Sequence, residues 1–251
     1  MNVNWDAEKY ARDFSYVSAY GEGVLGLVNF GPVRTAVDLG CGNGALTQEI
    51  ARRGVSVVGL DSSPDQLAAA RAAHPGIGFR LADATNFSLD EPVDLVFSNA
   101  VFHWIAREDQ PRMLACVARA LRPGGQLVFE FGGAGNNALI HGALASAFAE
   151  AGLAYRMPFY FPTIGEYAPL VEAAGLTVTH ATLFERPTEL SGPDGLRDWI
   201  DMFVKAPFAG VDAATAEGIK RRAVEALRPR LLRDGTWYAD YVRIRMRAVK
   251  R

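Results

Sequence analysis

A glycine-rich stretch after the first predicted strand is the first candidate for chemistry in this sequence. In it, Asp38 precedes Gly40, Gly42 and Gly44, and Cys41 lies between the first two glycines. Glycines permit a sharp turn and a close backbone approach to a ligand, because no Cβ intervenes. A carboxylate here would repel a pyrophosphate, so it favours a ligand that carries a cation or an amino group. The loop therefore predicts a cofactor site, and the alternative is a tight turn that binds nothing.

Two more carboxylates close the next two predicted strands. Asp61, followed by Ser62, lies about 20 residues after Gly42, at the distance where an acidic residue accepts hydrogen bonds from ribose hydroxyls. Asp83 ends the third strand, where a carboxylate can accept from an adenine amine. Each residue has a structural alternative, because Asp61 could cap the following helix and Asp83 could serve only to stabilise a turn.

Polar and aromatic side chains follow the fourth predicted strand, where doubly wound sheets bind their ligands. Asn99, Ala100, His103 and Trp104 are grouped there. His103 is the candidate general base for an acceptor that must lose a proton, and its alternative role is a structural hydrogen bond. Trp104 is a candidate to stack on a cofactor or to face a cation, and its alternative role is an apolar wall.

Alternating strands and helices must position these residues. Short apolar runs predict strands, and the amphipathic stretches between them predict helices. The strands are expected at 34–39, 55–60, 77–81, 93–98 and 126–131, and the helices at 44–53, 64–73 and 107–121. This order is typical of an α/β, Rossmann-like doubly wound sheet with helices on both faces.

The second half of the chain is less regular. Helices are expected at 137–151 and 165–174, a strand at 176–184, mostly helix over 187–236, and a half-exposed last strand at 242–249. We therefore expect three parts in the molecule. They are cap helices in 1–30, a core formed by 31–186 with 237–251, and a helical lid inserted over 187–236.

The composition is that of an ordinary soluble protein. Of the 251 residues, 49% are hydrophobic and 22% are charged, and the formal net charge is −2. This balance disfavours bulk attraction to nucleic acid or to an anionic membrane. Cys41 and Cys116 predict neither a disulfide framework nor a metal site, and neither a bilayer-spanning run nor a signal peptide is recognised. We expect a cytoplasmic monomer or homodimer that acts on a small molecule.

Taken in order, these motifs carry a family resemblance. VDLGCGNG, GLDSS, ADA, DLVFSNAVFHW and LRPGGQLVFEF together resemble the class I S-adenosylmethionine-dependent methyltransferases over about residues 34–131. More narrowly, SNAVFHWI with TWYADYVRIRMRAVK resembles the trans-aconitate methyltransferase-like group over most of the chain. The resemblance implies S-adenosylmethionine as the cofactor. It also implies a seven-stranded sheet whose last strand is antiparallel and inserted between the fifth and sixth.

The resemblance implies a role for each candidate cofactor residue. The methionine part would contact Asp38 and the Gly40–Gly42 turn, and its amino group would contact the backbone near Asn99. The ribose would bind to Asp61, and the adenine would contact Asp83 and Ala84. A helix that carries Tyr10 and Phe14 would close over the cofactor. Asn43 stands where the family more often has threonine, which is a mild departure.

The expected reaction is methyl transfer to a small-molecule acceptor. A carboxylate acceptor needs no base, whereas a natural-product hydroxyl or amine can require one. Arg156 or Arg186 could hold an acidic acceptor through a bidentate pair, unless both are surface charges. The alternatives are a cyclase or modified-cofactor transferase that binds the same cofactor, an NAD-linked oxidoreductase, and a silent binding module. The G-x-G-x-G spacing after an acidic residue disfavours the oxidoreductase.

Overall fold

The computed structural model describes residue 21 and residues 23–251, and its centre is a mixed sheet of eight strands. Tyr10 and Phe14, which were expected to close over the cofactor, lie outside the described residues. The strands are β1 (Thr35–Leu39), β2 (Ser56–Asp61), β3 (Gly78–Leu81), β4 (Val93–Asn99), β5 (Leu121–Gly132), β6 (Leu176–Leu190), β7 (Leu232–Arg233) and β8 (Thr236–Lys250).

The strand order confirms the topology that the family resemblance implied, and the two-residue strand β7 is an eighth strand beyond the seven expected. The order is β3-β2-β1-β4-β5-β8-β6, and β7 pairs only with β8. Strands β1 to β5 pair in parallel, whereas β8 is antiparallel to both β5 and β6. The last strand therefore lies between the fifth and the sixth. The order reverses between β1 and β4, so the carboxyl ends of these two strands open the crevice in which such sheets bind ligands.

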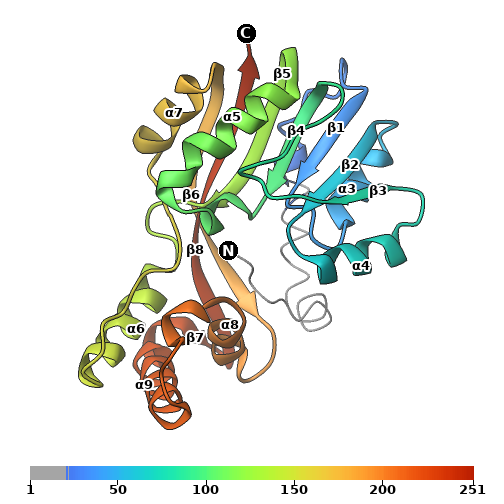
Figure 1. The fold of residues 1–251 in the computed structure, drawn as a ribbon. Helices are drawn as coiled ribbons and strands as arrows, with labels where there is room; N and C mark the ends of the chain where they lie inside the picture. Colours follow the sequence, from blue (N-terminus) through green and yellow to red (C-terminus); the bar gives the residue numbers. More distant parts are fainter. Residues whose placement is uncertain (1–20, 22) are drawn as a thin grey trace.

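Helices cover both faces of the sheet (Figure 1). They are α3 (Ala45–Ala51), α4 (Pro64–Ala73), α5 (Gln110–Ala120), α6 (Ala138–Glu150), α7 (Ile164–Ala173), α8 (Gly195–Phe203) and α9 (Ala213–Leu231), with short 3-10 helices η1 (Phe102–Trp104), η2 (Arg107–Asp109) and η3 (Ala206–Phe208). Apolar residues of α5 and α7 pack on one face of the sheet. Ile50 of α3 and residues 24–28 pack in a separate cluster against the strands. Each face thus has its own buried core.

A second apolar core lies beyond the end of the sheet. Strands β6 and β8 run on past their neighbours, and α6, α8 and α9 gather around their extended ends (Figure 1). The prediction that residues 187–236 are mostly helical is wrong for the first residues, because residues 187–190 continue β6. Helix α6, which was not assigned to this segment, packs against α9. The division of the chain into core and lid stays a prediction.

Strand β8 differs from its prediction in burial. The alternation of basic and apolar residues over 242–249 predicted a strand with one exposed face, yet no residue of β8 is fully exposed. Buried residues alternate there with partly buried ones. The apolar side chains, such as Ile244 and Met246, join the core under α5 and α7. The basic side chains face the other side, where Arg245 donates to the carbonyl of Gly23 (3.0 Å) and so lies against the N-terminal segment.

Candidate active site

The glycine loop between β1 and α3 has backbone angles that favour glycine. Gly40, Gly42 and Gly44 have φ of 77°, 53° and 81°, all in the left-handed region. A Cβ on Gly40 would lie 2.2 Å from the side chain of Val101, so the loop and the segment after β4 approach too closely for any other residue. Gly40 and Gly42 consequently present backbone to the crevice at the sheet's switch point.

Asp38 lies beneath this loop rather than in the crevice. Its side chain is 2% exposed, and Oδ2 accepts a hydrogen bond from the hydroxyl of Thr47 (2.6 Å). Burial raises the pKa of Asp38 to about 7, while the Thr47 hydrogen bond opposes the shift and the charge of Asp61 adds to it. Cys41 is also buried, and neither residue is among those that line the pocket. Asp38 can therefore act on a bound cation through its charge and through the loop above it.

Asp61 is held at the end of β2 by two backbone donors. The N–H of Gly42 donates to Oδ2 (2.9 Å), and the N–H of Ser63 donates to Oδ1 (2.8 Å). Helix α4 is capped instead by the hydroxyl of Ser63, which accepts from the N–H of Gln66 (3.3 Å). The capping alternative for Asp61 is thus filled by another residue. Each carboxylate oxygen keeps a lone pair that can accept from a ligand hydroxyl.

Asp83 stabilises a turn and also faces the crevice. Its Oδ1 accepts from both the N–H (2.7 Å) and the hydroxyl (2.8 Å) of Thr85. These hydrogen bonds lower the pKa of Asp83, so the residue is ionised at neutral pH. Because Oδ2 has no donor among the described residues, the turn role and a ligand role are compatible.

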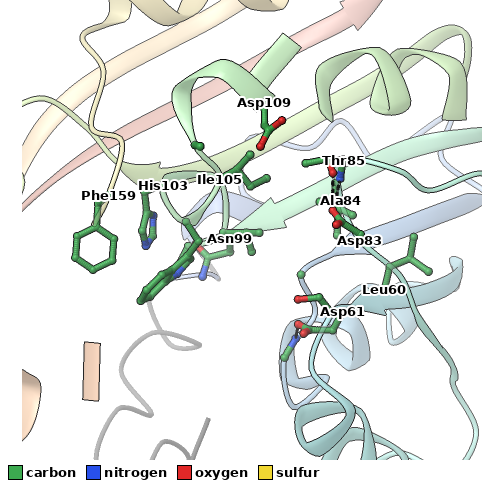
Figure 2. A pocket seen from close by; sticks show the side chains of 18 of the residues that line it. Leu60, Asp61, Asp83, Ala84, Thr85, Asn99, His103, Ile105, Asp109 and Phe159 are labelled. Carbon is green, nitrogen blue, oxygen red and sulfur yellow. Dashed lines mark hydrogen bonds between the residues drawn. The ribbon is translucent and has the colours of Figure 1, made fainter. Parts of the chain in front are cut away.

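These elements enclose a pocket of about 870 Å³ at the carboxyl ends of the parallel strands. Figure 2 shows Asp61 and Asp83 at one end, His103 and Phe159 at the other, and Asn99 between them. Of the residues predicted from sequence, the lining includes Gly40, Gly42, Asp61, Ser62, Asp83, Ala84, Asn99, Ala100, His103 and Trp104. One end of the pocket is therefore lined by polar residues at the ends of strands, and the other end is lined by aromatic side chains.

His103 is buried in η1 with a defined hydrogen-bonding state. Its Nδ1 accepts from the backbone N–H of Gly132 (3.3 Å), so the proton of the neutral ring is on Nε2. Burial, together with the charge of Arg243, holds the pKa of His103 well below its usual range. The ring is thus neutral and can donate a hydrogen bond into the pocket. This geometry favours a hydrogen-bond donor over the general base expected from the sequence.

Arg243 of β8 lines the pocket and is among the residues that the sequence reasoning missed. It is 7% exposed, and its guanidinium lies over the ring of Tyr241, 4.3 Å from the centroid. Its Nε is buried without a hydrogen-bond acceptor, and no ion-pair partner is found for it within the described part of the chain. An unpaired buried cation is costly unless a ligand supplies the anion. The sequence signal that could have identified Arg243 was the alternation of Arg243, Arg245 and Arg247 along the last strand.

The two arginines proposed from sequence lie elsewhere. Arg186 forms a bidentate pair with Glu130 (2.6 and 2.9 Å), and Glu130 is also bonded by Arg245 (2.8 Å). Arg156 is exposed. Neither Arg156 nor Arg186 lines the pocket.

Asn136 and Asn137 line the pocket and add polar groups to the end that holds Arg243. The amide oxygen of Asn136 accepts from the N–H of Val242 (3.0 Å), which ties the loop after β5 to β8. Asn137 has a left-handed φ of 53°, and its buried Oδ1 has no donor within the described residues. A strained residue with an unsatisfied oxygen in a pocket wall is a frequent feature of ligand sites.

Comparison with known proteins shows the family of this chain. A methyltransferase domain family matches residues 36–125. An uncharacterized methyltransferase of Schizosaccharomyces pombe is 33% identical over 258 residues, which cover 98% of each chain. The trans-aconitate 2-methyltransferase of Deinococcus radiodurans is 30% identical over 241 residues, which cover 89% of this chain and 91% of that protein.

The chain belongs to the class I S-adenosylmethionine-dependent methyltransferases. A solved structure of the TehB-like SAM-dependent methyltransferase from Corynebacterium glutamicum shares the fold, with a TM-score of 0.56 at 18% identity over 98% of each chain. The methyltransferase fold and the cofactor expected from the sequence are thereby confirmed. None of the described helices is long and apolar enough to cross a membrane.

The polar end of this methyltransferase's pocket fits S-adenosylmethionine. Asp61 offers carboxylate oxygens for hydroxyl donors, and Asp83 offers one for an amine. Gln66 lines the same end, and its buried Oε1 has no donor within the described residues. When bound, the cofactor supplies a methyl group activated on a sulfonium. The protein's remaining task is to orient an acceptor and exclude water.

Proposed function

We propose that this methyltransferase transfers the methyl group to a carboxylate oxygen of a small acid. The observation that carries the proposal is Arg243, a buried cation in the pocket wall with no anionic partner among the described residues. A guanidinium binds a carboxylate with charge-assisted hydrogen bonds, and it orients the planar group as it does so. The name of the Deinococcus radiodurans relative, a trans-aconitate 2-methyltransferase, points to the same chemical class.

His103 supports the same reaction. With its Nδ1 accepting from Gly132 and its pKa lowered, the neutral ring can donate from Nε2 to an acceptor oxygen but is a poor proton acceptor. A phenol or an ammonium group must lose a proton during methylation, and a base would be required near it. A carboxylate is already ionised at neutral pH. The pocket is thus suited to an acceptor that needs no base.

The helices beyond the sheet would form the cover of the acceptor end. Trp199 and Phe203 of α8 line the pocket next to Tyr241 of β8. We therefore assign the predicted lid, residues 187–236, together with α6, to acceptor binding rather than to cofactor binding. This assignment agrees with the general pattern in which inserted segments set specificity on a shared scaffold.

The test is to identify the product. Purified protein is incubated with S-adenosylmethionine carrying a labelled methyl group and with a panel of carboxylic acids, phenols and amines. We expect a methyl ester, which mild alkali hydrolyses to release labelled methanol. A methyl ether or a methylamine is stable to that treatment, and finding one of these as the main product would contradict the proposal.

Two arginine variants make the test specific. Arg243→Gln should lower kcat/KM for the acid about 10- to 100-fold, the effect of one or two charge-assisted hydrogen bonds. The KM for S-adenosylmethionine should stay unchanged. Arg156→Gln removes an exposed arginine that does not line the pocket and should behave as wild type.

A further inference from the structure

The acceptor end of the pocket is walled by aromatic rings. The lining there includes Trp104, Phe159, Phe161, Trp199, Phe203 and Tyr241. They come from four separate parts of the chain, namely η1, the segment before α7, α8 and β8. An apolar wall assembled from so many elements implies a ligand with a large apolar surface.

Two of the rings next to His103 form a nearly parallel pair. Phe159 and Phe161 stack with 5.4 Å between their centroids and 16° between their planes. Trp104 meets Phe159 edge-on at 4.8 Å, and Figure 2 shows Phe159 beside His103 at the pocket wall. Phe159 and Phe161 both line the pocket, so their rings project to the same side of this segment. Tyr160 between them projects away from the pocket and packs against Tyr167, with 6.4 Å between the ring centroids.

Arg243 is the single cation at this end of the described pocket. The charged residues of the whole lining are Asp61, Asp83, Asp109, Arg112 and Arg243. Arg112 pairs with Asp109 and donates to Thr85, so its charge is already committed at the cofactor end. The acceptor end therefore offers one site for one carboxylate. Any second carboxylate would meet only neutral groups there, the amides of Asn136 and Asn137 or ring faces, whose π electrons repel an anion.

We propose that the acceptor is a monocarboxylate with a flat, unsaturated body rather than a polycarboxylate. The inference rests on the proposed function and names the class of acid. The carboxylate pairs with Arg243 and accepts from Nε2 of His103, while the body lies against Phe159 and Phe161. The acceptor therefore differs in class from trans-aconitate, which carries three carboxylates and which a relative's name specifies.

The charges of the reaction balance without any other reactant. A carbon–oxygen bond forms between the methyl carbon and one carboxylate oxygen, and the carbon–sulfur bond breaks with its electron pair left on sulfur. The carboxylate loses its negative charge and the sulfonium loses its positive charge, so no proton moves. The neutral ester no longer pairs with Arg243, and its release should be easier than release of the acid.

The test compares three probe acids with wild-type protein and S-adenosylmethionine. They are trans-cinnamate, which is flat, 3-cyclohexylpropanoate, which has a similar size but a puckered ring, and trans-aconitate. We expect kcat/KM for cinnamate to exceed that for 3-cyclohexylpropanoate about 3- to 10-fold, the contribution of one aromatic contact. It should exceed that for trans-aconitate by at least about 100-fold, because two further carboxylates would be buried without a cation to pair with in the described lining.

Matched variants locate the effect in the wall. Phe161→Leu should reduce turnover of cinnamate more than turnover of 3-cyclohexylpropanoate. Tyr160→Leu alters the neighbouring ring that faces away from the pocket and should leave both unchanged. Equal or faster turnover of trans-aconitate, or failure of cinnamate to be methylated, would overturn the inference. Methylation of trans-aconitate alone would leave ester formation standing, whereas methylation of phenols alone would overturn both proposals.

Discussion

Gly132 of β5 lies directly opposite Arg243 of β8, so no side chain from β5 faces the guanidinium. Two residues along the same pair of strands, Glu130 lies opposite Arg245 and forms an ion pair with it (2.6 Å). Arg243 and Arg245 thus lie on one face of β8, and among the described residues only Arg245 of these two has an ion-pair partner. The unpaired arginine is the one that reaches the pocket.

This contrast predicts opposite effects on stability. Arg243→Met removes a buried charge that has no ion-pair partner among the described residues, and we expect the free energy of unfolding to rise by about 1–2 kcal/mol. Arg245→Met leaves Glu130, which is 3% exposed, with Arg186 as its remaining ion-pair partner. This change should lower the free energy of unfolding by about 1–3 kcal/mol. Urea unfolding of the cofactor-free protein measures both values. A loss of stability in Arg243→Met would show that this arginine has a structural partner.

Gly132 itself should be sensitive to a single methyl group. A Cβ there would lie 2.5 Å from the ring of Phe161 and 3.0 Å from Nδ2 of Asn136, so Gly132→Ala must displace the acceptor wall. We expect a rise of about tenfold or more in the KM for the acceptor, with unchanged affinity for S-adenosylmethionine. Gly142→Ala is the control, because its Cβ would meet nothing within 4 Å. Equal kinetics for the two variants would remove Phe161 from the acceptor site.

Asp61 should control the affinity for the cofactor. Asp61→Asn keeps the size of the side chain but loses the charge that accepts from ribose hydroxyls, so the Kd for S-adenosylmethionine should rise about 10- to 100-fold. Circular dichroism should show an intact fold. Asp65→Asn on the exposed first turn of α4 is the matched control. Calorimetric titration that finds the same affinity in both variants would contradict the ribose assignment.

The buried carboxyl of Asp38 predicts a specific dependence of stability on pH. Burial raises its pKa to about 7, whereas an unfolded aspartate has a pKa of about 3.9. Between these values the folded state holds one proton more, so the free energy of unfolding falls as the pH rises from about 4 to about 7. Asp38→Asn should flatten this part of the profile and be more stable than wild type at pH 8.

Binding of the cofactor should counter that loss in the wild type. The cofactor carries an amine and a sulfonium, which favour the ionised form of Asp38. S-adenosylmethionine should therefore raise the melting temperature of the wild type more at pH 8 than at pH 5. Asp38→Asn should show the same rise at both pH values. A wild-type profile as flat as that of the variant would show that Asp38 does not change its protonation state between these pH values, which would contradict the prediction.

The cofactor half of the site could be predicted from sequence for a simple topological reason. Asp61, Asp83 and Asn99 each lie within two residues after the end of a predicted strand, and the carboxyl ends of parallel strands meet at one edge of a sheet. Apolar runs identified those strands within a few residues, and the strand order then followed the family resemblance. The prediction extended to the antiparallel position of β8.

The acceptor half could be predicted only at His103 and Trp104, because the rest depends on pairs of residues far apart in the chain. Arg186 was a candidate for the substrate, but Glu130, 56 residues away in sequence, binds it. The alternation of Arg243 with apolar residues showed which side chains share a face. It did not show that this face is covered, and so the strand was predicted to be half-exposed although Arg243 is buried. The packing of α6 against α9 is equally invisible in local patterns.

The measurement that tests the account most directly is calorimetric titration of the S-adenosylhomocysteine complex. The acid turned over fastest in the panel is titrated beside its methyl ester, into wild-type protein and into Arg243→Gln. We predict that the wild type binds the acid at least about tenfold more tightly than the ester, and that the variant binds both equally weakly. If Arg243→Gln held the acid as tightly as the wild type, the carboxylate would be bound elsewhere and the central claim would be wrong.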